Sequence, residues 1–452
     1  MTSCSCMRRF LGTQFLLVLA ALVVAAFALP SHGSAATLNT LYAFCQSSCA
    51  DGAQPNSALL RDQDGNLYGV TPRGGASATG VVYEMSFDAV HGTWTYQTLF
   101  SFCDSNDKSC LAIEPVGSLI IDNDGNLYGV TGGNTKKTTG AVFELSPNQN
   151  RTHWAFKILY KFCRAICKSH GPTQPKSGLT YAGASTGVPF DGASPLYGTA
   201  ATGGASSGGA IYKLSPAKSG KKWKAKTLYD FCAKLNCADG GDPAAAPLID
   251  SAGNLYGTTE GGGAHGHGEV YELPHGGTTV SVLYSFCASA NCADGYEPTA
   301  SVIMDGTGNL IGTTGGGGNA CFTSAGCGLI FKLAPIGGGW QETVLYAFCQ
   351  QANCTDGAVP YGGVTMDASG NLFGTTENGG SEYADGHGSG IVYELSGTSL
   401  TVLHAFCGAD PCSDEGHPEA GLTMDPSGSL YGTTNFSLVP DQSWGTVFQL
   451  TP

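Results

Sequence analysis

Apolar and polar residues alternate along this chain in runs of about four to eight residues, and clusters of Gly, Asp and Asn separate the runs. The segment GNLIGTT at residues 308–314 is one such run. A period of two is typical of half-buried β-strands, and no segment sustains the 3.6-residue period of a helix. The pattern therefore predicts an all-β fold built from short strands.

The same set of four strands returns seven times, at intervals of 55 to 69 residues. Each set reads Leu-x-x-Asp (strand A), Asn-Leu-Tyr-Gly-Thr-Thr (B), Gly-x-Val-Tyr-Glu-Leu (C) and Val-Leu-Tyr-x-Phe (D), with variations. An Asp-x-x-Gly-Asn element joins A to B in most sets, where Asp begins a tight turn and Gly supplies the positive φ that closes it. Regular repeats of this kind bury their apolar faces against neighbouring repeats.

Seven units of four antiparallel strands predict a seven-bladed β-propeller over residues 36–452, with blades starting near residues 45, 103, 163, 232, 287, 349 and 407. A β-helix would use shorter coils, and a sandwich would not repeat seven times. The last unit ends after its C strand, while residues 36–44 form a D-type strand that belongs to no preceding unit. We therefore expect this N-terminal strand to complete blade 7 and close the ring.

Residues 1–35 have the order of a secretory signal: Arg8 and Arg9, an apolar run from Phe15 to Leu29, then small residues with a cleavage site near Ala35. An uncleaved membrane anchor is the alternative, although the run is short for a spanning helix. The prediction is a secreted, periplasmic or cell-surface protein with no membrane span after cleavage.

If the protein is exported, its cysteines are in an oxidising compartment and can form disulfides. Of the 18 cysteines, Cys4 and Cys6 fall in the signal, and the remaining 16 form close pairs. In an oxidising compartment such spacing predicts local disulfides, whereas structural zinc would need four converging ligands. The predicted pairs are Cys45/Cys49, Cys103/Cys110, Cys163/Cys167, Cys232/Cys237, Cys287/Cys292, Cys321/Cys327, Cys349/Cys354 and Cys407/Cys412.

The formal net charge of −14 becomes −16 once the two signal arginines are removed. Nucleic acid is disfavoured as a partner because phosphate binding needs a basic surface. Only 12% of residues are charged and 67 are Gly, as expected for a chain rich in turns. We expect a monomer.

The run Gly-Asn-Leu-Tyr-Gly-Thr-Thr, followed by Gly-Gly and then Gly-x-Val-Tyr-Glu-Leu, resembles the bacterial GloVer (Gloeobacter–Verrucomicrobia) repeat over essentially the whole mature chain. The resemblance implies an exported tandem-repeat protein and supplies no catalytic residues. The chain departs from the pattern in blade 3, where the A–B hairpin expands through residues 181–195.

In propellers the D–A and B–C connections usually share one face, which would place the cysteine loops and the Gly-rich loops together. We call it the loop face and expect a binding site there. The candidate residues are Glu260, His265, His267, Glu377, Asp385 and His387. His265 and His267 are the best metal or acid–base candidates, with a solvated loop as the competing interpretation.

Other polar residues recur and indicate structure. Asp51, Asp239, Asp294 and Asp356 lie in Asp-Gly turns and are expected to be turn formers rather than calcium ligands. The strand-C glutamates Glu84, Glu144, Glu272 and Glu394 are expected on a solvated face, and Trp94, Trp154, Trp223 and Trp340 in packing positions.

These features favour a non-catalytic binding or interaction scaffold for a glycan, a peptide or a cell-envelope partner. No catalytic residues are assigned and no metal ligands are assigned. No cofactor is expected, with calcium as the alternative. The chain has no phosphate-loop Gly-Lys-Ser/Thr and no Gly-x-Ser-x-Gly elbow. The alternative is a secreted carbohydrate-active hydrolase or lyase using paired carboxylates near the central channel.

Overall fold

The computed structural model describes residues 36–45, 48–103, 110, 112–133, 140–162, 171–217, 223–318, 326–380, 387–408, 415–435 and 444–451. The chain divides into two units, Met1–Ser34 and Ala35–Pro452. The first unit, and with it the predicted signal segment, lies outside the described residues. Everything below concerns the second.

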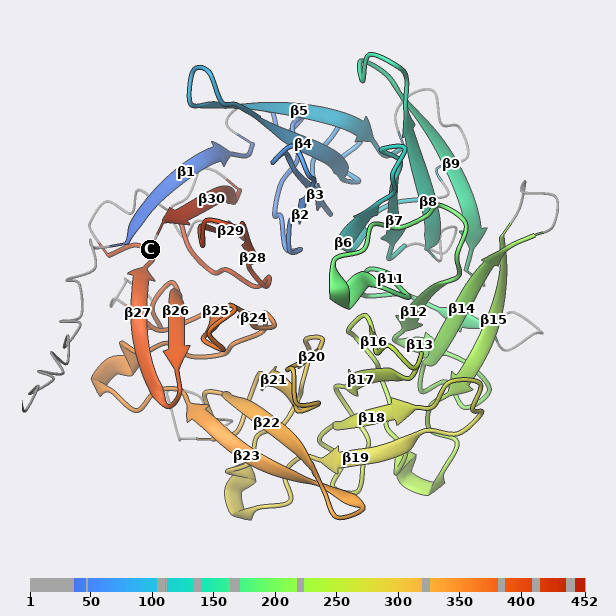
Figure 1. The fold of residues 1–452 in the computed structure, drawn as a ribbon, viewed down its shortest axis with the longest axis vertical. Helices are drawn as coiled ribbons and strands as arrows, with labels where there is room; N and C mark the ends of the chain where they lie inside the picture. The colour runs from blue at the N-terminus through green and yellow to red at the C-terminus, as the bar shows by residue number, and fades with distance from the viewer. Residues whose placement is uncertain are drawn as a thin grey trace, which may run out of the picture. The chain divides into compact units, whose positions relative to one another are not determined.

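Seven four-stranded antiparallel sheets form a propeller ring, as the repeat predicted, with the A strands toward the centre and the D strands outside (Figure 1). The A strands are β2 (Leu60–Arg61), β6 (Pro115–Ile121), β11 (Thr180–Tyr181), β16 (Leu248–Ile249), β20 (Ile303–Met304), β24 (Thr365–Met366) and β28 (Thr423–Met424). The B strands are β3 (Leu67–Thr71), β7 (Leu127–Thr131), β12 (Leu196–Ala200), β17 (Leu255–Thr259), β21 (Leu310–Thr314), β25 (Leu372–Thr376) and β29 (Leu430–Thr434).

The C and D strands complete each blade. The C strands are β4 (Val81–Asp88), β8 (Ala141–Pro147), β14 (Ala210–Pro216), β18 (Glu269–Leu273), β22 (Leu329–Ile336), β26 (Ile391–Ser396) and β30 (Thr446–Thr451). The D strands are β5 (Thr93–Ser101), β9 (Trp154–Lys161), β15 (Trp223–Asp230), β19 (Ser281–Ser285), β23 (Gly339–Ala347), β27 (Ser399–Ala405) and, for blade 7, β1 (Thr37–Ala43).

The N-terminal strand closes the ring. β1 pairs antiparallel with β30, from Thr37 opposite Thr451 to Ala43 opposite Thr446, and the two ends of the colour scale meet there in Figure 1. The amide of Phe44 then donates to the carbonyl of Gly445 at 2.9 Å, and the corresponding D-strand phenylalanines make the same bond in the other six blades. The closure predicted from the sequence is confirmed.

The A–B hairpins use the turn that the Asp-x-x-Gly-Asn element predicted. In blade 4 the Gly253 amide donates to the Asp250 carbonyl at 3.0 Å, and the Asn254 amide donates to Asp250 Oδ1 at 2.8 Å. Gly253 has φ of +85°, a conformation that residues with a Cβ rarely adopt. The carboxylate thus nucleates its own turn.

Each residue of the Gly-Thr-Thr sequence in the B strands makes a contact that explains its identity. A Cβ on Gly257 would overlap the Tyr271 hydroxyl of the adjacent C strand. Thr258 Oγ1 donates to the Ala300 carbonyl of the next blade at 2.9 Å, and Thr259 Oγ1 donates to the Gly261 carbonyl of its own loop. The first threonine therefore ties neighbouring blades together, and the second holds the B–C loop.

The hydrophobic core lies between adjacent blades. Its largest fully buried side chains include the C-strand rings Tyr83, Tyr212 and Tyr271 and the D-strand rings Phe44 and Phe231. Trp154 and Trp223 are also buried, as predicted for packing residues. No helix in the described part of the chain is long and apolar enough to cross a membrane.

Blade 3 departs from the regular hairpin, as its sequence predicted. Between β11 and β12 the chain forms a short 3-10 helix, η1 (Ala184–Thr186), and then makes a parallel bridge between Phe190 and Asp122 of blade 2. Two further short strands, β10 (Pro172–Thr173) and β13 (Thr202–Gly203), pair beside this blade. We call residues 182–195 the blade 3 insertion.

Candidate functional site

Disulfides close the D–A loops. The structure contains five of the eight predicted pairs: Cys45–Cys49, Cys103–Cys110, Cys232–Cys237, Cys287–Cys292 and Cys349–Cys354. In blades 4–6 the second cysteine ends a 3-10 turn: η2 (Leu235–Cys237), η3 (Ala290–Cys292) and η4 (Ala352–Cys354). These loops are closed locally, as the spacing predicted.

The other three predicted pairs include cysteines that lie outside the described residues: Cys163, Cys167, Cys321 and Cys412. The structure therefore does not test the bond predicted between Cys163 and Cys167, which stays a prediction. Cys407 and Cys327 are disulfide-bonded. Their predicted bonds to Cys412 and to Cys321 also stay predictions, because neither of these two partners is described.

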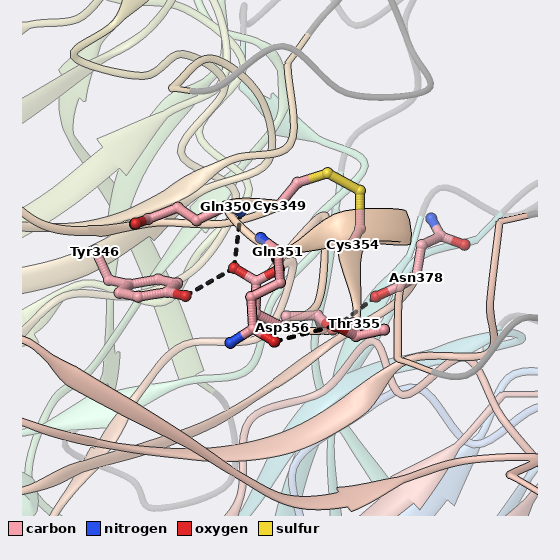
Figure 2. Close-up of a disulfide and its surroundings, with 9 residues drawn as sticks. Tyr346, Cys349, Gln350, Gln351, Cys354, Thr355, Asp356 and Asn378 are labelled. Carbon is pink, nitrogen blue, oxygen red and sulfur yellow. Dashed lines mark hydrogen bonds between the residues drawn. A yellow bond between two sulfur atoms is a disulfide. The ribbon is translucent and has the colours of Figure 1, made fainter.

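A buried aspartate braces each of the loops of blades 4–6, as Figure 2 shows for Asp356. The Tyr346 hydroxyl and the Gln350 amide donate to Asp356 Oδ2 at 2.7 and 2.8 Å, and the Gln351 amide donates to Oδ1 at 3.1 Å. Asp239 and Asp294 bind the same three kinds of donor in their blades. Their carboxylates are used by the fold, in line with the predicted structural role.

The Gly-rich B–C loops pack directly on the disulfide loops. The Gly380 amide donates to the Cys354 carbonyl at 3.0 Å, and Ala358 and Asn378 form an antiparallel bridge. Gly75, Gly263 and Gly318 donate to the matching cysteine carbonyls of blades 1, 4 and 5. Both kinds of loop therefore lie on one face, the loop face.

A ring of residues with positive φ surrounds the inner end of this face. In every blade the residue before the proline that leads into strand A has φ between 52° and 61°, although none is Gly: Gln54, Glu114, Gln174, Asp242, Glu297, Val359 and His417. In blades 2–7 the backbone carbonyl of this residue accepts a hydrogen bond from the backbone amide of the residue that follows the B strand. In blade 4, for example, the Glu260 amide donates to the Asp242 carbonyl at 3.1 Å. Such backbone strain persists only where the surroundings enforce it.

Four glutamates from four blades converge on this inner ring. Burial raises the pKa of Tyr361, and the carboxylates of Glu377, Glu297, Glu419 and Glu260 all raise it further. The four glutamates come from blades 4, 5, 6 and 7. Their carboxylates can all lie close to the Tyr361 hydroxyl only near the axis of the ring, where these blades approach one another. We call these four glutamates, with Tyr361, the carboxylate rim.

Glu377 and Glu419 are neighbours within the rim. Burial and the neighbouring Glu419 carboxylate raise the pKa of Glu377 to about 7, although Asn378 Nδ2 donates to Glu377 Oε2 at 3.3 Å. Burial also raises the pKa of Glu419, whose Oε1 accepts from Asn435 Nδ2 at 2.6 Å. Glu377 is therefore a carboxyl group that gains and loses a proton near neutral pH.

Glu260 stands at the edge of the rim, next to a cation. Lys176 of blade 3 lies 3.2 Å from Glu260 Oε2 and 3.1 Å from Asp242 Oδ1. Burial raises the pKa of Glu260 and the Lys176 charge opposes that shift. Lys176 thus neutralises the negative charge of Glu260. Among the described residues, no ion pair supplies a cation to Glu377 or Glu419.

The three predicted site histidines lie in exposed loops. His265 and His267 are exposed in the blade 4 B–C loop, and His387 is exposed in the blade 6 loop. The His267 ring lies 5.6 Å from the Tyr296 ring, centroid to centroid. Asp385 lies outside the described residues. Glu260 and Glu377 thus both act on Tyr361, whereas the three histidines are exposed in their loops, with the His267 carbonyl accepting from the backbone amide of Glu297 at 3.0 Å.

Potential metal ligands gather in two places in the described part of the chain: His267 with Cys287 and Cys292, and Cys327 with Cys349 and Cys354. All of these cysteines are disulfide-bonded. A cysteine binds a metal through its thiolate, which a disulfide cannot supply. Neither group can act as a cysteine metal site in the oxidised protein.

Two buried carboxylates were not expected from the sequence. Glu84, predicted on a solvated face, is 4% exposed, because Arg151 of the next blade lies 3.5 Å from Glu84 Oε1 and the Tyr68 hydroxyl donates to it at 2.8 Å. The Glu269 carboxylate is fully buried and has no hydrogen-bond partner among the described residues, and burial together with nearby Asp239 raises its pKa to about 8. At that position blades 1, 5 and 6 have Val81, Leu329 and Ile391, whereas blades 2, 3 and 7 have Ala141, Ala210 and Thr446.

Charge is distributed unevenly around the ring. Residues 36–231, which form blades 1–3 and strand β1, hold 17 Lys and Arg against 13 Asp and Glu. Residues 232–452 hold only Lys234 and Lys332 against 22 Asp and Glu. The carboxylate rim belongs entirely to this second region, so its acidity extends that of the surrounding blades.

Fold and repeat together define the class: a disulfide-stapled, seven-bladed β-propeller repeat protein. The Gloeobacter/Verrucomicrobia repeat matches residues 26–193 and 184–448, so the chain belongs to that family. This confirms the resemblance seen in the repeat motif. No curated protein matches the chain in sequence.

Solved structures with a similar arrangement have little sequence in common with it. An α-L-arabinanase from Penicillium chrysogenum, complexed with arabinobiose, is 11% identical over 92% of this chain and 97% of its own, with a TM-score of 0.46. Trypanosoma rangeli sialidase is 13% identical over 80% of this chain and 56% of its own, with a TM-score of 0.42. TolB from Acinetobacter baumannii is 11% identical over 64% of this chain and 54% of its own, with a TM-score of 0.36. This chain thus spans about half the length of TolB and of the sialidase.

Proposed function

We propose that this protein is an exported, non-catalytic binding scaffold whose carboxylate rim takes up a cationic ligand, such as a basic peptide or an amine-bearing component of the cell envelope. The observation that carries the proposal is the convergence of Glu260, Glu297, Glu377 and Glu419 on Tyr361. Disulfide-closed loops suit an oxidising compartment outside the cytoplasm.

The chemistry of the rim favours a cation over an anion or a neutral group. Glu377 and Glu419 are partly buried beside each other, and an ammonium or guanidinium group between them would relieve their repulsion. The Tyr361 ring, 38% exposed, offers a face for a cation–π contact. The acidic blades around the rim would also attract a cation at long range and speed its association.

Calorimetry with tetralysine at low ionic strength tests the proposal, with Nε-acetylated tetralysine as the neutral probe. We expect wild type to bind tetralysine only, and the Glu377→Gln/Glu419→Gln double variant to lose roughly tenfold or more in affinity. Glu394→Gln is the matched control, because it makes the same change on strand C of blade 6, away from the rim. Equal losses in the double variant and the control, or no binding at all, would disprove the proposal.

The pH dependence gives a second measurement. Glu377 has a pKa of about 7, so raising the pH from 6 to 8 deprotonates it and should strengthen tetralysine binding. The Glu377→Gln variant should show a flatter pH profile over this interval. An unchanged profile would mean that Glu377 does not face the ligand.

One observation favours a second function, that of a carbohydrate-active hydrolase or lyase. A carboxyl group with a pKa near 7 next to a second carboxylate is the pairing that general acid–base catalysis on glycosides uses. Glycan turnover that disappears in both Glu260→Gln and Glu377→Gln, with the fold intact, would establish this function instead.

A further inference from the structure

A cavity of about 700 Å³ opens on the opposite face, where the A–B and C–D hairpins lie. It is bounded by the A–B hairpins of blades 1 and 2, by Arg151 of the blade 2 C–D hairpin and by the blade 3 insertion. Sites for small ligands commonly measure about 300–1,000 Å³. The corresponding space between the hairpins of blades 5 and 6 is about 460 Å³ and has no inserted wall.

The insertion that forms this wall is held in place on two sides. Phe190 is fully buried and packs edge-to-face on Tyr128 of blade 2, with ring centroids 5.1 Å apart. Ser185 Oγ donates to the Ile249 carbonyl of blade 4 at 3.1 Å. The insertion therefore spans blades 2 to 4 as a fixed wall, and a preformed wall lowers the entropy lost on binding.

The charged groups of the cavity argue against an acidic ligand. Asp62 and Asp122 line it, and their carboxylates already accept bonds from side chains of their own blades: Asp62 from Asn66 at 3.0 Å, and Asp122 from Asn126 and Tyr128 at 2.8 and 2.9 Å. The lining therefore holds four carboxylates and two guanidinium groups, those of Arg61 and Arg151, and Arg151 is already paired with Glu84 at 3.5 Å. This negative balance disfavours an acidic ligand.

The remaining groups are suited to hydroxyls. The amide side chains of Gln63 and Asn123 can donate and accept, and Asp64 and Asp124 can accept, at the tips of two facing hairpins. The Tyr181 ring lines the cavity with its hydroxyl donating to the Val188 carbonyl at 2.8 Å, so the ring is held in one orientation. Arg151 is likewise fixed, over the Trp154 ring at 5.2 Å.

We propose that this cavity is a second binding site, distinct from the carboxylate rim, and that it takes a neutral polyhydroxylated ligand such as the terminal sugars of an uncharged glycan. The amide and carboxylate groups bind the hydroxyls, and the Tyr181 ring with Leu60 and Leu179 covers the apolar face of the sugar. The site exists because blade 3 alone carries an insertion that completes it.

A printed array of neutral and acidic glycans, followed by calorimetry with the strongest neutral glycan, tests the assignment on the full oxidised protein. In the main variant the turn of blade 4, Asp-Ser-Ala-Gly-Asn (residues 250–254), replaces residues 182–195. We expect this replacement to lower the affinity at least tenfold, because it removes one wall. Tyr181→Leu keeps an apolar wall and should lower the affinity several-fold without unfolding the blade.

The rim variant Glu377→Gln/Glu419→Gln is the matched control and should bind the glycan like wild type. It also separates the two proposals, since tetralysine binding should be lost in that variant and kept in the blade 3 replacement. The assignment would be overturned by an array on which no neutral glycan binds above background, or by unchanged glycan affinity in both the replacement and Tyr181→Leu.

Discussion

Blades 1–3 and blades 4–7 are built on one strand pattern but differ in charge and in where they depart from the repeat. In the first region, positive and negative charges are nearly balanced, and Arg151 and Lys176 form ion pairs between blades. This region also carries the blade 3 insertion, on the face where the A–B and C–D hairpins lie. The second region has almost no cations, and its departures from the repeat are carboxylates on the loop face. One scaffold thus presents different chemistry at opposite faces of different blades.

At the inner ring, the difference between the two regions comes from very few positions. Directly after the B strand, blades 1–3 have Pro72, Gly132 and Ala201, whereas blades 4 and 6 have Glu260 and Glu377. These residues lie at equivalent places on the inner ring, where the backbone is fixed by the strained residue before proline. A propeller can therefore acquire a polar site by single substitutions at its inner end without altering its strands.

Deleting residues 36–44 should have the largest effect, because it breaks the seam between the two regions. The deletion removes β1 from blade 7, exposes the edge of β30 and takes the fully buried Phe44 out of the core. We expect the melting temperature of the whole ring to fall sharply. A control deletion within the exposed blade 1 C–D turn, residues 89–92, should shift it little. An unchanged melting temperature in the first deletion would refute the closing role of β1.

Glu269→Val should stabilise the acidic region in a pH-dependent way. The folded-state pKa of Glu269, about 8, lies above its ordinary value of 4.5, so the protonated group costs no stability in acid, and the folded state loses stability as the pH rises from 4.5 to about 8. Valine removes this effect, by about 2–4 kcal/mol at pH 8 and by little at pH 4. Thermal unfolding at the two pH values measures it.

The reverse change sharpens the comparison. Val81→Glu places the same carboxyl group at the equivalent, fully buried position of blade 1, and should destabilise the protein more at pH 8 than at pH 4. Equal shifts at both pH values in either variant would contradict a buried, titrating carboxyl group.

Arg151→Met tests the tie between blades 1 and 2. It leaves Glu84, 4% exposed, without its cation, which should destabilise the fold by about 1–3 kcal/mol. Lys157→Met, which breaks the more exposed pair with Glu144, should lower stability by less than about 1 kcal/mol. Denaturant midpoints of the two variants compare them directly, and similar midpoints would argue against the buried tie.

Lys176→Met should have the smallest effect on stability, about 0.5–1 kcal/mol, since the lysine side chain is 46% exposed. Its effect on the rim is more specific. Removing the charge that lowers the pKa of Glu260 should raise that pKa further. NMR titration of the glutamate side chains would detect the shift, and an unmoved Glu260 would mean that the seam between blades 3 and 4 is not electrostatic.

Most of the fold could be predicted from the sequence because its determinants are local and repeated. The Asp250–Asn254 turn, the Gly257 that admits Tyr271 and the lone strand at residues 37–43 each carry their own physical reason. Glu260 and Glu377 were predictable as site candidates because they interrupt Gly-rich loops that the repeat places on one face.

The rest of the site depends on contacts between blades, which the local pattern does not contain. Glu297 and Glu419 flank prolines and look like turn residues in sequence, and only the ring brings them to Tyr361. Glu84 appeared solvated because its partner Arg151 comes from the following blade. The uneven distribution of Lys and Arg is visible in the sequence and is the signal that could have located the acidic rim.

The pairing of β1 with β30 also constrains how this protein folds. Among the described strands, β1 pairs only with β30, with Thr37 opposite Thr451. Blades 1–6 can each assemble from consecutive strands, but blade 7 must join the two ends, and contacts between such distant segments form slowly. Ring closure is therefore expected to be the final folding event, and until then β30 presents an open sheet edge on which a second chain could pair.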